Sequence, residues 1–375
     1  MTVPLSNEEK LTRALERKVF ELKQAKSLNK TMLRRGGFAF ESVIEDLRKV
    51  LSEEQKEPFQ ITVTPEKVGA PLDRAHTETA ALALSDWHLS ELVKPSSSNG
   101  INSYSTMTCA NRVSKLGEKT VRIINLHRKL YTIEELWIVV LGDMISGSIH
   151  PELLLTNELT DSVATILSAR LLQMLVMDLK QLNIPIRIDC VVGNHSRMLA
   201  KMPTKAQASL SYDWMIYEML ADYFSKDSSV NVNVHTGQIA QVQKYNWKYI
   251  LEHGMEVSSS KEEDFEDRIR ALFDDPTYRE ATGLKGSAFD QIVIGNMHKP
   301  KILERTIVNG SLVGQNELGM SWRLKPIRAQ QMLWGISKSH VRTWHYPIDL
   351  TSVRSEKGDN KYSLYTKSFM RKHAK

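Results

Sequence analysis

The sequence predicts an α/β fold, and three observations lead to this prediction. Short apolar runs rich in Val and Ile recur along the chain and end in small polar clusters, as buried strands do. Helical patterns lie between several of them, at 161–182 and 211–224. Alternation of strand and helix favours parallel pairing. The 375 residues are 41% hydrophobic and 25% charged, which is enough for a full core and excludes fibrous and wholly disordered classes.

The first element is a charged helical stretch at residues 7–57. Its apolar residues recur at spacings of three and four, which predicts amphipathic helices, and the glycines at 36–37 divide it in two. Up to position 60 there are 12 basic and 10 acidic residues. Because these charges nearly cancel, an arm for homo-oligomerisation is favoured over an arm that grips nucleic acid. Residues 58–79, with three prolines, are typical of a linker.

The next domain, at 80–350, contains five apolar runs that we predict to be strands. They are Ala81–Leu84, Trp137–Leu141, Ile186–Val192, Tyr249–Leu251 and Ile292–Ile294. Asp, His or Asn follows the end of each run. Open α/β sheets bind ligands beyond the carboxyl ends of their strands, so these polar side chains are expected to converge.

Three further segments complete the chain. A charged insertion at 258–290 separates the last two polar clusters and is either a surface excursion or a flap over them. Residues 301–348 predict a β-rich end. Residues 351–375 form a basic tail with interspersed Tyr and Phe, which is either solvated or suited to a phosphate backbone and exposed bases.

The polar residues at the predicted strand ends have the chemistry of a metal site. They are Asp86, His88, Asp143, Asn194, His195, His253, Asn296 and His298. Carboxylate, imidazole and amide without thiolate suit Mn²⁺, Fe²⁺, Mg²⁺ or Zn²⁺ and disfavour a structural Cys-type zinc site. On a strand, Asp86 and His88 would share one face, as would Asn296 and His298.

These clusters also resemble a known family. The segments in question are Asp86-Trp87-His88, Gly142-Asp143 up to Gly147, Gly193-Asn194-His195, His253-Gly254 and Gly295-Asn296-Met297-His298. In this order they resemble the motifs of the calcineurin-like metallophosphoesterases, over about 82–350, and the residues around them resemble a phage-encoded, exonuclease-like branch of DNA repair nucleases. The resemblance implies a sandwich of two mixed β-sheets flanked by helices, here with an N-terminal helical extension.

The resemblance further implies two divalent metal ions, with Mn²⁺ expected and Mg²⁺, Fe²⁺, Zn²⁺ or Ni²⁺ as alternatives. The first ion would be held by Asp86, His88, Asp143 and His298. The second would be held by Asp143, Asn194, His253 and Asn296. Two such cations clamp a phosphate and activate water for an in-line displacement.

Three residues near these motifs have candidate roles beside the metals. His195 would protonate the leaving oxygen or stabilise charge on the phosphate. Arg197 would contact a phosphate oxygen, with a plain surface role as the alternative. His150 would line the substrate cleft or begin a helix.

The sequence departs from the family pattern at three positions. Asn296 stands where His is usual, which favours Mn²⁺ or Mg²⁺ over Zn²⁺ or weakens the second metal. Ser196 stands where an acidic residue is usual, and Met255 where His or Asp is common. The last two bear on the residues that support the ligands.

The charge distribution indicates the substrate class. The net charge is +6, yet Lys299–Lys375 contains 15 basic and 5 acidic residues. Together with the resemblance, this predicts a phosphodiesterase acting on nucleic acid, a DNA exo- or endonuclease. The alternatives are a small-molecule phosphodiesterase or phosphatase, for example on cyclic nucleotides, and a degenerate metal-binding scaffold.

Two cysteines, Cys109 and Cys190, do not form a disulfide scaffold or a C-x-x-C pair. With the polar, charged N-terminus they indicate a reducing, cytoplasmic setting, which would be the host cytoplasm for a phage-encoded protein. No apolar run approaches the length of a membrane span, so no membrane partner is expected.

Overall fold

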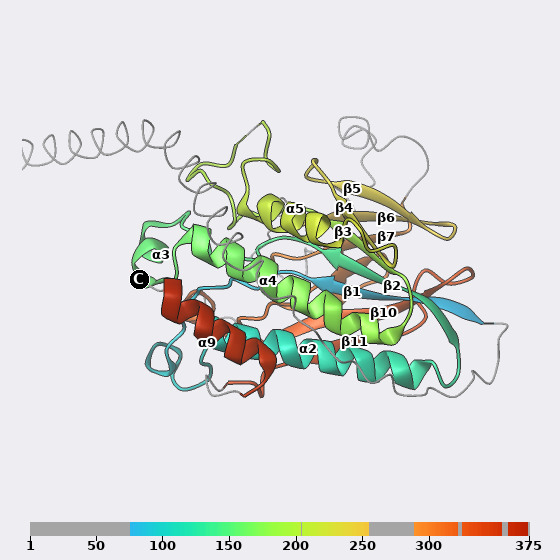
Figure 1. Ribbon diagram of the computed structural model, residues 1–375, viewed down its shortest axis with the longest axis horizontal. Coiled ribbons are helices and arrows are strands. Elements are labelled where there is room, and N and C mark those ends of the chain that lie inside the picture. The colour runs from blue at the N-terminus through green and yellow to red at the C-terminus, as the bar shows by residue number, and fades with distance from the viewer. Residues whose placement is uncertain (1–75, 204, 255–288, 322–324, 355–358, 374–375) are drawn as a thin grey trace, which may run out of the picture. The chain divides into compact units, whose positions relative to one another are not determined.

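The protein was analysed as a computed structural model, which describes residues 76–203, 205–254, 289–321, 325–354 and 359–373 (Figure 1). Three predictions lie outside these residues. They concern the helical stretch at 7–57, all but the end of the linker at 58–79, and the insertion at 258–290 apart from its last two residues.

The described strands form two sheets, each with parallel and antiparallel pairs. The six-stranded sheet has the order β11-β10-β1-β2-β3-β4. Its strands are β1 (Thr77–Leu84), β2 (Thr132–Val140), β3 (Ile186–Cys190), β4 (Val230–Val234), β10 (Gln330–Ser337) and β11 (His345–Asp349). The five-stranded sheet has the order β5-β6-β7-β9-β8. Its strands are β5 (Ala240–Lys244), β6 (Trp247–Glu252), β7 (Gln291–Ile294), β8 (Lys301–Ile302) and β9 (Thr306–Val308).

The two sheets face each other across one apolar core. Alternate residues of β2 and β10 point into it, among them Trp137, Val139 and Trp334, and they meet Tyr249 and Leu251 of β6. The rings of Trp137 and Tyr249 pack edge to face at 5.0 Å. This contact joins the two sheets directly and confirms the predicted sandwich of two mixed sheets.

Helices cover the other face of the six-stranded sheet, where residues such as Leu82 and Ile138 are fully buried. They are α2 (Thr106–His127), α4 (Asp161–Leu179), α5 (Tyr212–Phe224) and α9 (Lys361–His373). Helix α4 packs against α2, α5 and α9 (Figure 1). The stretch Asp161–Leu182, which includes the short η2 (Lys180–Leu182), is long and apolar enough to cross a bilayer, but 67% of its most apolar window is buried by these neighbours.

Three short helices lie in loops of the described part of the chain. They are η1 (Pro95–Ser98), α3 (Pro151–Thr156) and α8 (Glu317–Ser321). The residue before α3 is His150, whose backbone is extended as is usual at a helix start. The helix-start role proposed for His150 is therefore confirmed.

The structure corrects the prediction for the basic tail. Residues 361–373 form α9, which packs against α2 and α4, so this part of the tail is not a solvated segment. Tyr362 and Phe369 are buried, and the Tyr362 hydroxyl donates to Asp178 of α4 at 2.8 Å. These two aromatic rings belong to the core of the domain and are not exposed for contact with bases.

The predicted strands are all present, although some bounds differ. Strand β2 begins at Thr132, before its apolar half, because Thr132, Ile133 and Glu135 continue the ladder with β1, with a bulge at Glu134. Helix α2 had no counterpart in the prediction. Its inner face buries Asn111 and Arg112, and these polar residues interrupt the apolar periodicity that marks a helix.

Candidate metal centre

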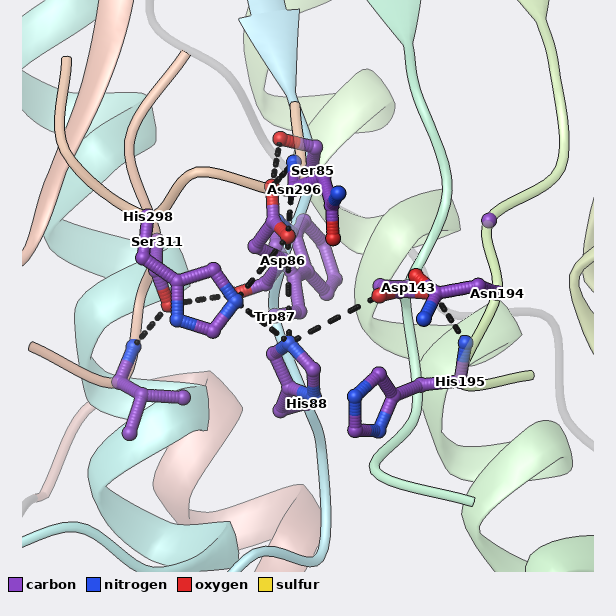
Figure 2. A network of polar contacts seen from close by, with 12 residues as sticks. Ser85, Asp86, Trp87, His88, Asp143, Asn194, His195, Asn296, His298 and Ser311 are labelled. Carbon is purple, nitrogen blue, oxygen red and sulfur yellow. Dashed lines mark hydrogen bonds and ion pairs between the residues drawn. The ribbon is translucent and has the colours of Figure 1, made fainter. Parts of the chain in front are cut away.

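The polar residues predicted at five strand ends do converge. Figure 2 shows those that follow β1, β2, β3 and β7. They follow β1, β2 and β3 of the first sheet and β6 and β7 of the second, so both sheets contribute to one site. Among the described residues there are three groups of possible ligands, and within each group the ligand atoms lie within 4.8 Å of one another. The groups are Asp86–His88–His298, Asp86–Asp143–His253 and His88–Asp143–His195.

The first group joins Asp86, His88 and His298. The Nε2 atoms of His88 and His298 are 3.1 Å apart. The Oδ1 of Asp86 lies 3.3 Å from Nε2 of His298 and 3.9 Å from Nε2 of His88. Two imidazole nitrogens and a carboxylate oxygen therefore face the same small space, as ligands of one cation do.

Asn194 adds an amide oxygen beside Asp143 and His253. The Nδ1 of His253 lies 2.6 Å from the carbonyl oxygen of Leu141 and must carry the hydrogen of that bond. Its Nε2 lies 2.9 Å from Oδ1 of Asn194 and 3.0 Å from Oδ2 of Asp143. A neutral His253 would present a lone pair to two oxygens, so a cation or a proton is needed between them.

Asp143 belongs to the other two groups of possible ligands. Its Oδ1 accepts the main-chain N–H of His195 at 2.7 Å. Its Oδ2 is buried, lies between Nε2 of His253 and Nε2 of His88 at 3.0 and 3.9 Å, and has no hydrogen-bond donor unless His253 is protonated. A buried carboxylate oxygen without a hydrogen bond is unfavourable unless a cation compensates it. The residues present therefore fit the binding of divalent metal at this site.

Burial and neighbouring charges shift the pKa values of His253, His88 and Asp143 in the site. Burial opposes protonation of His253, but the charge of Asp143 outweighs it and raises the pKa of His253 to about 10. Burial, with the nearby His195 and His298, lowers the pKa of His88 well below its usual value. Burial opposes ionisation of Asp143, yet the surrounding imidazoles keep the pKa of its carboxyl low. A protonated His253 would thus supply positive charge to Oδ2 of Asp143.

The backbone of the site corrects one geometric prediction. Asp86 and His88 lie beyond the end of β1, and Asn296 and His298 lie beyond β7, so neither pair shares the face of a strand. Five site residues have a left-handed backbone conformation instead. They are Asp86, His88, Asp143, Asn296 and His298, with φ between 43° and 63°. Such conformations cost energy in residues other than glycine and are concentrated at functional sites.

A chain of polar contacts fixes Asp86. The hydroxyl of Ser85 donates to Oδ2 of Asp86 at 2.5 Å and accepts from the amide of Asn309 at 2.8 Å. The same Asn309 amide donates to Oε1 of Gln331 on β10. The main-chain N–H of Asn296 donates to both carboxylate oxygens of Asp86, at 3.2 and 3.1 Å. Asp86 is held in place by residues from both sheets.

Asp213, which was not assigned a role from the sequence, supports the second motif. This fully buried residue of α5 accepts hydrogen bonds from the main-chain N–H groups of Asp143, Met144 and Gly193. Burial and the charge of Asp143 raise the pKa of Asp213 to about 6, while its hydrogen-bond donors oppose the rise. The sequence signal that could have found it is an acidic residue in the first turn of a helix, after Ser211.

His195 lies inside the site, whereas His150 lies at its margin. His195 packs edge to face on His88, with ring centroids 4.6 Å apart, and its Nδ1 lies 3.0 Å from the carbonyl oxygen of Ser146 (Figure 2). Since it lies beyond β3, strand alternation does not turn it away from the ligands. The exposed ring of His150 lies 6.0 Å from that of His195, which places it at the margin of the site.

Arg197 and Asn296 are held by main-chain carbonyls. The guanidinium of Arg197 donates to the carbonyl oxygens of Asn194, Leu199 and Ala200 at 2.7, 3.0 and 2.9 Å, so it stabilises its own loop. The side-chain amide of Asn296 donates to the carbonyl of Gly254 at 3.1 Å. Asn296 thus reaches Asp86 through its main chain, and its side chain as a metal ligand stays a prediction. Met255 lies outside the described residues.

Comparison with known proteins adds little to this geometry. No family model and no curated protein matches the sequence. Among solved structures, Vps29 from Cryptosporidium parvum is 14% identical, with a TM-score of 0.30, covering 69% of this chain and 86% of that one. The E. coli phosphoesterase YfcE is 14% identical, with a TM-score of 0.30, covering 72% and 100%. Zinc-bound Vps29 from Entamoeba histolytica is 10% identical, with a TM-score of 0.28, covering 72% and 99%. At these TM-scores the similarities carry no argument about activity.

Proposed function

We propose that this protein is a metal-dependent phosphoesterase with two divalent ions, most simply Mn²⁺. The observation that carries the proposal is the buried Oδ2 of Asp143, which lies 3.0 Å from Nε2 of His253 and 3.9 Å from Nε2 of His88 and has no hydrogen-bond donor unless His253 is protonated. The residues that would hold the ions are Asp86, His88, Asp143, Asn194, His253 and His298, with Asn296 as a further ligand. Bound divalent cations supply positive charge for phosphate oxygens and lower the pKa of water.

The protein's own residues supply the proton chemistry. The carbonyl of Ser146 only accepts, so Nδ1 of His195 carries the hydrogen of their contact. The Nε2 of His195 is then the atom that exchanges a proton with substrate, and a protonated His195 donates it to the leaving oxygen. The bond from the His195 main chain to Asp143 keeps this imidazole in register with the proposed bridging carboxylate.

We further propose that the substrate is a nucleic-acid phosphodiester, with DNA as the first candidate. Support comes from the excess of basic residues between Lys299 and Lys375 and from the exposed Arg371 and Lys372 at the end of α9. The burial of Tyr362 and Phe369 removes base stacking by these rings from that support. A small phosphodiester or phosphomonoester is the second candidate, because the centre itself selects only a phosphate.

One substrate panel tests both levels of the proposal. The purified full chain is assayed with Mn²⁺, Mg²⁺, Zn²⁺ or Ni²⁺ on single- and double-stranded DNA, RNA, cyclic nucleotides and a nitrophenyl phosphodiester. We expect cleavage of DNA that falls steeply with added salt, because each neutralised phosphate releases counterions. Asp143→Asn should abolish turnover, whereas Asp222→Asn, which changes an exposed carboxylate on α5, should not.

The other outcomes identify the alternatives. Turnover of cyclic nucleotides or the nitrophenyl ester with little effect of salt would replace the nucleic-acid substrate with a small one. Metal binding without turnover of any phosphoester would reject the enzyme and favour a scaffold. Failure to bind any of the four metals would reject the metal centre itself.

A further inference from the structure

The second and third motifs lie in two loops that touch at the centre of the site. One loop follows β2 and contains Gly142 and Asp143, and the other follows β3 and contains Gly193. A Cβ atom added at Gly193 would lie 2.2 Å from Oδ1 of Asp143, and one added at Gly142 would lie 2.1 Å from the main-chain nitrogen of Gly193. The position of Asp143 therefore depends on what holds these loops together.

A single carboxylate binds both loops. The Oδ2 of Asp213 accepts from the main-chain N–H groups of Asp143 and Gly193, both at 2.9 Å. Its Oδ1 accepts from the N–H of Met144 at 3.0 Å and from the hydroxyl of Ser196 at 2.7 Å. Four donors, two from each loop, thus meet one fully buried side chain.

Helix α5 favours a carboxylate at this place. Asp213 lies in the first turn of α5, after the N-cap Ser211, whose hydroxyl accepts from the N–H of Asp213 at 3.2 Å. The N-terminal turn of a helix stabilises negative charge. The four hydrogen bonds to an ionised group are each stronger than bonds between neutral partners.

We propose that Asp213 is the positioning residue for the carboxylate of Asp143 and that it replaces, from α5, the acidic residue missing at position 196. The hydroxyl of Ser196 donates to Asp213, so a short donor at 196 and a carboxylate at 213 are complementary. The inference rests on the proposed metal centre, since positioning matters only for a bound ion. Asp213 itself contacts main chain and Ser196 and is not proposed as a metal ligand.

The test measures Mn²⁺ affinity by calorimetry, without substrate, together with kcat and KM. Asp213→Asn turns an amide N–H toward N–H donors, so we expect Mn²⁺ affinity and kcat to fall by ~10–100-fold, with KM little changed. Glu218→Gln, an exposed carboxylate on the same helix, should leave all three unchanged. Asp189→Asn alters another buried carboxylate and should lower thermal stability but not Mn²⁺ affinity.

A charge swap gives the sharper result. The double variant Asp213→Ser with Ser196→Asp places the carboxylate on the other partner of the 2.7 Å bond and should recover most of the lost Mn²⁺ affinity. Wild-type Mn²⁺ affinity in Asp213→Asn would overturn the proposal. If Asp213→Asn does not fold, the swap decides, and a swap that does not restore Mn²⁺ binding counts against it. A wild-type protein that binds Mn²⁺ but hydrolyses nothing would reject the proposed function while leaving the positioning role to be read from affinity alone.

Discussion

Substitution of Gly193 by alanine tests how tightly the loops that follow β2 and β3 must pack. The added Cβ would lie 2.2 Å from Oδ1 and 2.5 Å from the main-chain nitrogen of Asp143, where ordinary contact begins near 3.4 Å. The loops would have to separate by about 1.2 Å to bring the 2.2 Å contact with Oδ1 to 3.4 Å. Gly193 has no left-handed φ, so this contact is the whole effect. A misplacement of about 1 Å costs roughly 100-fold in rate.

We expect Gly193→Ala to remain folded, with a loss of ~1–3 kcal/mol from overpacking, and to lose about 100-fold in kcat. Mn²⁺ affinity should fall with it, because the displaced group is the Asp143 carboxylate. Turnover of the best substrate from the panel and Mn²⁺ calorimetry measure the two effects. Gly237→Ala is the matched control, since its Cβ would lie 3.3 Å from the carbonyl of Ile239 in an exposed loop. Unchanged kcat and Mn²⁺ affinity in Gly193→Ala would refute the reasoning.

Three other measurements follow from the structure. His195→Gln should lower kcat by ~10²–10⁴-fold while metal content, measured by elemental analysis, stays at two ions per chain; a loss of metal would make His195 a ligand instead. Removing metal with a chelator should lower the melting temperature, and Mn²⁺ at about 100 times its Kd should restore about 2.7 kcal/mol. Burial opposes ionisation of Asp189, but bonds from His235, Arg187 and Trp137 lower its pKa. Its stabilising charge is therefore present at neutral pH and is lost as pH falls through this lowered pKa. Asp189→Asn should lower the free energy of unfolding, measured with urea, by about 1.5–3 kcal/mol near neutral pH and by less in acid.

The convergence of the candidate ligands could be predicted because their signal is local. Each lies next to an apolar run that ends in a polar cluster, and the order of the clusters resembles that of one family. The prediction that Asp86 and His88 share a strand face failed because both residues lie past the strand in left-handed conformations. Local spacing indicates which residues meet, but the backbone conformation that brings them together depends on the loops.

Asp213 and the tail show two different reasons for a missed prediction. Asp213 contacts residues 17 to 70 positions away, so only the packing of α5 gives it a role. Tyr362, Thr366 and Phe369 recur at helical spacing and are all buried on one face of α9, so this signal was present in the sequence. The basic residues between them favoured an interpretation by charge, which concealed the amphipathic pattern.

The contacts of Ser196 and Asn296 show that these two departures from the family pattern have different consequences. The acid absent at Ser196 is compensated, because Asp213 accepts the hydrogen bonds of both loops and of Ser196 itself. The change at Asn296 is compensated only in part. Its main-chain N–H still supports Asp86, which any residue at 296 would do, but its side-chain amide donates to Gly254. A neutral amide oxygen is the harder ligand, so we expect a side chain of Asn296 that binds metal to favour Mn²⁺ or Mg²⁺ over Zn²⁺. The main-chain N–H that supports Asp86 is independent of that side chain, so the support of Asp86 should not weaken.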